Sequence, residues 1–270
     1  VTPEFQRVTR SQQSAVNKLS HGQQSLWALQ TMDPGNVAYS IAKAMRISGS
    51  LDVMALQRSV DMLLMRHDML RSCFVEKDGV PERRVLNNRF ITVNAVNASE
   101  MGENELRVVL EEKARASFNL ATDPLLRIAV YSLTDKDHIL FMNIHHIICD
   151  FKSLQILIIE LGDFYHSFVS AAEVMLPEQL CTYQDFVDWR DTANVDQARV
   201  YWKNQFNEVI PVLTIPTDLE RPNVQQFAGD IIVDEVEEEL YQQLTALRQR
   251  LGVTRYGVLF TCYQVLLNRF

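Results

Sequence analysis

Two adjacent histidines, followed four residues later by an aspartate, are the residues of this sequence best suited to chemistry. His145, His146 and Asp150 lie in the run HHIICD. A neutral imidazole carries a lone pair near pH 7, so a correctly oriented histidine can take a proton from an attacking amine or hydroxyl. Successive strand residues point to opposite faces of a sheet, so only one histidine can enter a given cleft. The run therefore favours proton transfer at one histidine.

A purely structural interpretation of the same run stays open. The two histidines could be a satisfied core pair and Asp150 a turn or cap residue, because short motifs also occur by chance. Cys149 lies inside the run and could suggest a thiol nucleophile. We expect it to be a packing residue instead, since unpaired cysteine is among the most buried residue types and buried thiols are inert.

The segments on either side of the run predict the elements that position it. Residues 126–132 and 138–146 are nearly continuous apolar runs, the pattern of neighbouring central strands buried on both faces. After the run, with Ser153 as the candidate N-cap, a helix is predicted. Its apolar stripe consists of Leu154, Leu157, Ile158, Leu161, Tyr165 and Phe168.

The remaining sequence alternates between helical and strand periodicity. Residues 1–16 are polar and aperiodic, which indicates a linker or arm. Strands are predicted at 37–47, 70–76, 81–85, 91–94 and 229–236, with Asp78-Gly79 as a turn. Helices are predicted at 23–32 (N-cap Ser20), 53–64, 103–118, 183–191, 196–209, 237–251 and 254–270.

Composition excludes several classes of protein. The chain has 270 residues, a formal net charge of -8 and a pI near 5.3. We therefore expect no nucleic-acid surface, and the basic pair Arg83-Arg84 is interpreted as a solvated strand edge. The four cysteines lie far apart without a CxxC pair, which argues against disulfides and zinc and favours a cytoplasmic location. No apolar stretch is long enough to span a membrane, so no membrane partner is expected.

Four motifs along the chain, in order, resemble those of the condensation domains of non-ribosomal peptide synthetases. The opening SxxQxxLW motif matches residues 20–27, and RHxxLRxxF matches residues 66–74. The HHxxxDG motif matches His145 to Asp150, and YxDxxxW matches residues 183–189; PTDLERP at 216–222 is a smaller similarity. One match could be accidental, but four in order are consistent with a single family.

The resemblance implies an α/β fold, an α+β two-layer sandwich of the chloramphenicol acetyltransferase type. In that family two such lobes form a V, and a tunnel between them admits phosphopantetheine arms. Residues 17–180 would be the N-terminal lobe and 181–270 the incomplete beginning of the C-terminal lobe. The last predicted helix reaches Phe270 inside an apolar run, so the chain is expected to be truncated. These residues alone are expected to be nearly inactive, because a tunnel needs both walls.

The resemblance also implies roles for individual residues. His146 would meet the reacting amine and thioester, as general base or by positioning the amine and stabilising the intermediate, while His145 would be structural. Asp150 would be an orienting salt-bridge residue, with Arg66 and Arg71 as candidate partners and an arginine elsewhere still open. Phe151 stands where the family has glycine, a departure that could narrow the pantetheine passage.

Amide formation between an upstream acyl or peptidyl thioester and a downstream aminoacyl amine is the implied activity. Retention of both histidines argues against the heterocyclising relatives. The implied partners are carrier domains and adjoining synthetase or polyketide synthase modules, with phosphopantetheine delivered by the carriers and no directly bound cofactor or metal. Two alternatives are coenzyme A-dependent acyl transfer and a non-catalytic carrier-docking scaffold of the same fold.

Overall fold

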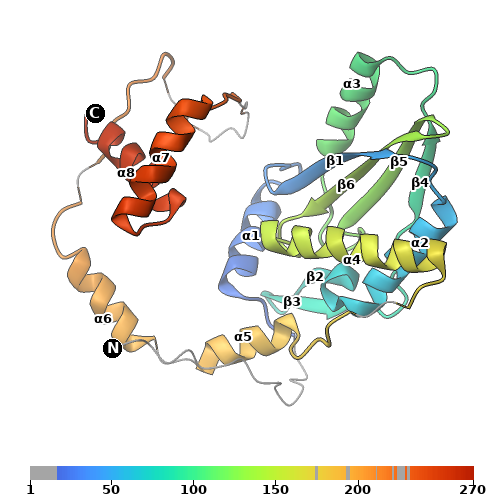
Figure 1. Cartoon of the computed structure of the whole chain (residues 1–270). Helices are drawn as coiled ribbons and strands as arrows, with labels where there is room; N and C mark the ends of the chain where they lie inside the picture. The colour runs from blue at the N-terminus through green and yellow to red at the C-terminus, as the bar shows by residue number, and fades with distance from the viewer. Residues whose placement is uncertain are drawn as a thin grey trace. The chain divides into compact units, whose positions relative to one another are not determined.

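A four-stranded sheet forms the centre of the first part of the chain. The computed structural model describes residues 17–173, 176–192, 195–210, 212–220, 222–223, 229 and 232–270. The strands are β1 (Ser40–Ser48), β4 (Val93–Asn97), β5 (Leu126–Thr134) and β6 (Asp137–His145), in the order β1-β6-β5-β4 (Figure 1). Only β4 and β5 pair in parallel. The predicted adjacency of the two most apolar strands is confirmed.

Helices lie against both faces of this sheet because strand side chains alternate. Leu140, Met142 and Ile144 of β6 belong to the main core with residues of α2 (Val53–Arg66) and α4 (Phe151–Ser170). Phe141 points the other way and packs with Leu106 of α3 (Glu103–Ala114). The helix α1 (His21–Met32) begins at the capping box that Ser20 and Gln23 form.

A two-stranded hairpin, preceded by a 3₁₀ turn (η1, Asp68–Arg71), completes the first part. The strands β2 (Ser72–Lys77) and β3 (Val80–Val85) pair antiparallel. Asp78 and Gly79 connect them with positive φ angles of 52° and 79°, as a two-residue type I′ turn requires. The prediction of a solvated strand edge at Arg83-Arg84 is wrong for Arg83, whereas Arg84 is exposed. Arg83 is only 2% exposed because Asp68, Ser72 and other groups bind its guanidinium.

The chain divides by its internal contacts into two compact units, residues 1–193 and 194–270. Helix α5 (Tyr183–Thr192) belongs to the first unit, where Tyr183 and Gln184 bind Ser20 and Arg83. The second unit contains α6 (Asp196–Gln205), α7 (Glu238–Leu251) and α8 (Arg255–Leu267). The predicted lobe boundary at residue 180 stays a prediction.

Several predicted boundaries move by a few residues. The helix α3 ends at Ala114 instead of residue 118, so that Phe118 enters the core. The predicted strand 229–236 is wrong at residues 229 and 232–236, which form no strand, whereas 230–231 lie outside the described residues, as does the predicted linker 1–16. Among the helices that the structure describes, none is both long and apolar enough to cross a membrane.

Candidate active site

The two histidines of the HHIICD run occupy opposite environments. The last residue of β6 is His145, whose side chain is 1% exposed, whereas the side chain of His146 is exposed. The chain then turns over residues 146–148, where the Ile148 N–H donates to the His145 carbonyl over 3.1 Å. The His146 N–H donates to the Tyr39 carbonyl over 2.8 Å, which anchors the turn to the segment before β1. One imidazole is therefore buried and the other exposed, in keeping with the expectation that only one of them can enter a cleft.

His145 is held as a neutral imidazole with a defined tautomer. Its Nδ1 accepts the Ile147 N–H over 3.0 Å, so its proton must lie on Nε2, which is 3.4 Å from the Gln30 Oε1. The Phe118 ring packs edge-on, with ring centroids 5.9 Å apart. Burial, together with the nearby His146, lowers the pKa of His145 from 6.5 to about 4. His145 is therefore a fixed structural group at neutral pH.

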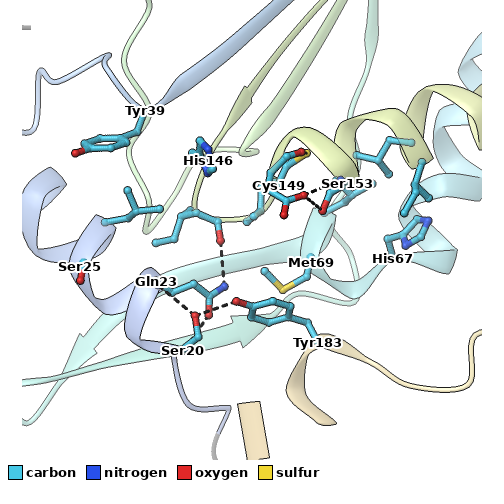
Figure 2. Close-up of a pocket in the computed structure, with 18 of the residues that line it drawn as sticks. Ser20, Gln23, Ser25, Tyr39, His67, Met69, His146, Cys149, Ser153 and Tyr183 are labelled. Carbon is cyan, nitrogen blue, oxygen red and sulfur yellow. Dashed lines mark hydrogen bonds between the residues drawn. The ribbon is translucent and has the colours of Figure 1, made fainter. Parts of the chain in front are cut away.

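His146 faces a pocket of about 620 Å³ within the first unit (Figure 2). Apolar side chains supply much of its wall, and the hydroxyl-bearing residues Ser20, Ser25, Tyr39 and Tyr183 also line it. Other lining residues are Gly22, Gln23, Leu26, Leu29, His67, Met69, Leu70, Ile147, Ile148, Cys149, Asp150, Ser153, Ile156 and Leu157.

All four sequence motifs contribute residues to this one pocket. Ser20, from the first motif, and Tyr183, from the last, are joined by a hydrogen bond of 2.9 Å between their hydroxyl oxygens. The second motif supplies His67 and the third supplies His146. Motifs spread over more than 160 residues thus meet at one place. Sequence reasoning missed Tyr39, whose place in the wall follows from the pairing of β1 with β6.

Asp150 caps a helix and makes no ion pair with the predicted arginines. Its Oδ1 accepts from the Ser153 N–H and the Ser153 hydroxyl, each over 2.7 Å, so Asp150 and not Ser153 is the N-cap of α4. These hydrogen bonds are the main reason that the pKa of Asp150 lies below its usual value. The first-turn donors of α4 therefore satisfy the carboxylate locally.

The two candidate arginine partners bind other groups. Arg66 Nε donates to Glu160 Oε1 over 3.1 Å, and Arg71 Nε donates to the Leu64 carbonyl over 2.8 Å. Arg66 neutralises the buried carboxylate of Glu160, and Arg71 is held by the carbonyl of Leu64 in α2. Within the part of the chain that the structure describes, the predicted salt bridge from Asp150 to either arginine is therefore wrong.

Neither Cys149 nor Phe151 presents a reactive group to the pocket. Burial raises the pKa of the Cys149 thiol to about 12, so it remains protonated and unreactive, as expected for a packing residue. Phe151 is 73% exposed, does not line the pocket and has no positive φ. Within the first unit, phenylalanine at this position therefore neither strains the backbone nor narrows the pocket.

His67 lines the pocket but both of its ring nitrogens are engaged. Its Nε2 lies 2.6 Å from Glu160 Oε2, and Gln179 Nε2 lies 3.1 Å from its Nδ1. The carboxylate must accept, so Nε2 donates and Nδ1 accepts from the Gln179 amide. These contacts hold the His67 ring in place as a structural part of the pocket wall.

Comparison with known proteins gives one consistent family. The Condensation domain family model matches residues 13–270. Tyrocidine synthase 3 of Brevibacillus parabrevis is 34% identical over 93% of this chain, and gramicidin S synthase 2 of Brevibacillus brevis is 31% identical over 93%. This chain spans only 4% and 6% of the lengths of those two relatives.

Solved structures agree on the fold. An X-domain from teicoplanin biosynthesis superposes with a TM-score of 0.83 at 18% identity, covering 98% of this chain and 60% of that one. The first condensation domain of the CDA synthetase superposes with a TM-score of 0.74 at 18% identity, covering 95% of this chain and 63% of that one. The family match over nearly the whole chain and the shared fold together show that this chain belongs to the condensation-domain family of non-ribosomal peptide synthetases.

Proposed function

We propose that this chain supplies the histidine-bearing part of the active site of an amide-forming condensation domain, with His146 as the catalytic residue. One observation carries the proposal. Of two adjacent histidines, one is locked inside the fold by hydrogen bonds while the other presents an exposed imidazole to a pocket. A base must reach the proton that it removes, and His146 alone of the pair can do so.

The reaction needs one proton acceptor near the attacking nitrogen. The amine of a downstream aminoacyl thioester attacks the carbonyl carbon of an upstream acyl or peptidyl thioester, and a C–N bond forms. His146 takes the proton that the nitrogen loses and returns it to the departing sulfur as the C–S bond breaks. The products are an amide and a free thiol, so atoms and charge balance without a metal or a redox cofactor.

The pocket suits a pantetheine thioester as substrate. Such an arm alternates methylene groups with amides, and the residues that line the pocket include both apolar Leu26, Leu29 and Ile156 and polar Ser25 and Tyr39. Relatives are named tyrocidine and gramicidin S synthases, and one solved neighbour is described as a four-domain nonribosomal peptide synthetase. By that likeness we expect carrier domains and adjoining modules as partners, in the cytoplasm.

Replacement of His146 by alanine in a synthetase that carries this chain tests the proposal. We expect the rate of amide formation to fall about 10²- to 10⁴-fold, the usual contribution of a positioned acid-base group. The matched control is His166→Ala, which removes an exposed imidazole on α4 that does not line the pocket. Mass spectrometry of carrier-bound products measures both rates. Full turnover by His146→Ala would overturn the proposal.

Two other functions give different results in the same assay. An X-domain related in fold has been solved as a complex with OxyB, which favours a docking role as the second candidate. A docking domain would retain partner binding and lose no product when His146 becomes alanine. A coenzyme A-dependent acyltransferase would turn over free coenzyme A thioesters as fast as carrier-loaded ones.

A further inference from the structure

Two buried glutamines of helix α1 form hydrogen bonds with residues on either side of His146. Gln23 and Gln30 are seven residues apart, which is close to two helical turns, so they lie on the same side of the helix. They are 3% and 5% exposed, although glutamine is mostly a surface residue. A buried amide must find hydrogen-bond partners. One partner of Gln23 is Ile147 itself, and one partner of Gln30 is His145, which in turn binds Ile147.

Gln23 uses the two ends of its amide for two different purposes. Its Oε1 accepts the Ser20 N–H over 3.1 Å, which closes the capping box of α1. Its Nε2 donates to the Ile147 carbonyl over 3.0 Å (Figure 2). The cap of one helix is therefore joined to the residue that follows His146.

Gln30 reaches the same residue through His145. Its Nε2 donates to the Pro34 carbonyl over 3.0 Å, so its Oε1 is left to accept from His145 Nε2 over 3.4 Å. That contact keeps the His145 proton on Nε2 and leaves Nδ1 free to accept the Ile147 N–H. Both backbone groups of Ile147 are thus fixed from α1, the carbonyl by Gln23 and the N–H by way of Gln30.

We propose that Gln23 and Gln30, here called the glutamine clamp, are positioning residues that fix the backbone after His146 and so set the direction of its imidazole. This inference rests on the proposed function, because it assigns the clamp a role in that reaction. The clamp acts on geometry alone, since neither glutamine carries a charge. A displacement of a catalytic group by about 1 Å can cost about 10²-fold in rate, so loss of a clamp contact should lower kcat.

Three identical substitutions on one helix test the clamp. Gln23→Glu keeps an oxygen for the Ser20 N–H but cannot donate to the Ile147 carbonyl. Gln30→Glu places a carboxylate beside His145, which favours an imidazolium whose Nδ1 can no longer accept. Gln24→Glu adds the same charge at an exposed position outside the pocket. It also removes an amide donor from a backbone carbonyl, that of Leu19, and is therefore the matched control.

We expect the two clamp variants to lose about 10- to 100-fold in kcat with KM changed less than about 3-fold, while Gln24→Glu stays unchanged. In Gln30→Glu the acidic limb of the pH–rate profile should also move to higher pH. The titratable neighbour of His145 is His146; the other groups against it are the Gln30 amide, the Phe118 ring and the Ile147 N–H. Thermal melts measure any loss of stability separately.

Clamp variants that are folded and as active as Gln24→Glu would overturn the inference. Failure of the proposed function looks different, because His146→Ala would then retain full turnover. NMR of ¹⁵N-histidine in the chain gives a readout that needs no activity. We expect the His145 proton on Nε2 in the parent chain and a raised His145 pKa in Gln30→Glu, and an unchanged His145 signal in Gln30→Glu would also overturn the clamp.

Discussion

Two adjacent residues of the same type have different chemistry here because their surroundings differ. His145 ends a buried strand, where an imidazolium has neither solvent nor an anion to stabilise it, so it stays neutral. His146 follows immediately but lies in a turn at the pocket. The environment that suppresses the charge on one histidine also gives the other a rigid support.

The neutral state of His145 should make the protein sensitive to acid. The pKa of His145 is about 4 in the fold and 6.5 ordinarily, so between these values the unfolded chain binds a proton that the folded chain does not. Stability therefore falls as the pH drops from about 6.5 to 4, by about 3 kcal/mol in total. His145→Asn keeps an acceptor for the Ile147 N–H but loses the ring that packs against Phe118, so the variant should be less stable at pH 7. Because asparagine does not titrate, the variant should lose less stability on acidification.

Urea unfolding at a series of pH values checks this prediction. His166→Asn makes the same substitution at an exposed position and is the matched control. Parallel curves for His145→Asn and the parent chain would show that His145 does not titrate as proposed.

At the residue scale, sequence reasoning predicted the directions of side chains better than their hydrogen-bond and ion-pair partners. Alternation along the strand predicted that the two histidines point to opposite faces, because that rule is local, and the resemblance assigned the structural role to His145. In the structure His145 is buried and His146 is exposed. Sequence reasoning failed for the burial of Arg83 and for the hydrogen-bond partners of Asp150, because both depend on which groups meet after folding. Arg83 binds Gln184, 101 residues away, and Arg66 binds Glu160, 94 residues away. No periodicity in the sequence encodes such pairs.

At the element scale, the aspartate of the HHIICD run acts at the beginning of α4. The Asp150 side chain accepts from two donors of Ser153, and a carboxylate at this end also complements the helix dipole. The sequence predicted the helix but placed its cap at Ser153, because both residues are good caps and only the backbone decides between them. The turn after His146 therefore ends in a well-anchored helix.

Capping predicts how substitutions of Asp150 rank. Asp150→Ala should destabilise the fold by about 1 kcal/mol, and Asp150→Asn by less than about half of that, since asparagine also caps helices. Because the Asp150 carboxylate caps α4, we expect the turnover of Asp150→Asn to stay close to that of the parent. Urea unfolding and product formation measure the two effects. A loss of stability in Asp150→Asn as large as in Asp150→Ala would contradict the capping role.

At the scale of the whole molecule, the two compact units differ in how they bury apolar side chains. The first unit has a continuous core built from α2, α4 and the main sheet, and its pocket lies beside that core. The sequence predicted the strands and helices of this unit because their amphipathic patterns are complete within it. In the second unit, among the residues described, only Val258 is buried. The strand predicted at 229–236 does not form at residues 229 and 232–236. A strand needs a partner to pair with, and the alternating pattern within one segment does not provide that partner.

This difference should be measurable as backbone protection. Amides of α4 lie in a packed helix and should exchange with solvent only by global or large-scale opening. Those of α7 and α8 belong to helices whose large apolar residues, among them Leu240, Tyr256 and Phe260, are exposed, so little packing energy opposes local opening. In hydrogen-exchange mass spectrometry of the 270-residue chain, we expect α7 and α8 to exchange at least about 10²-fold faster than α4. Equal protection of the two units would show that the second is stabilised by contacts other than burial of its own side chains.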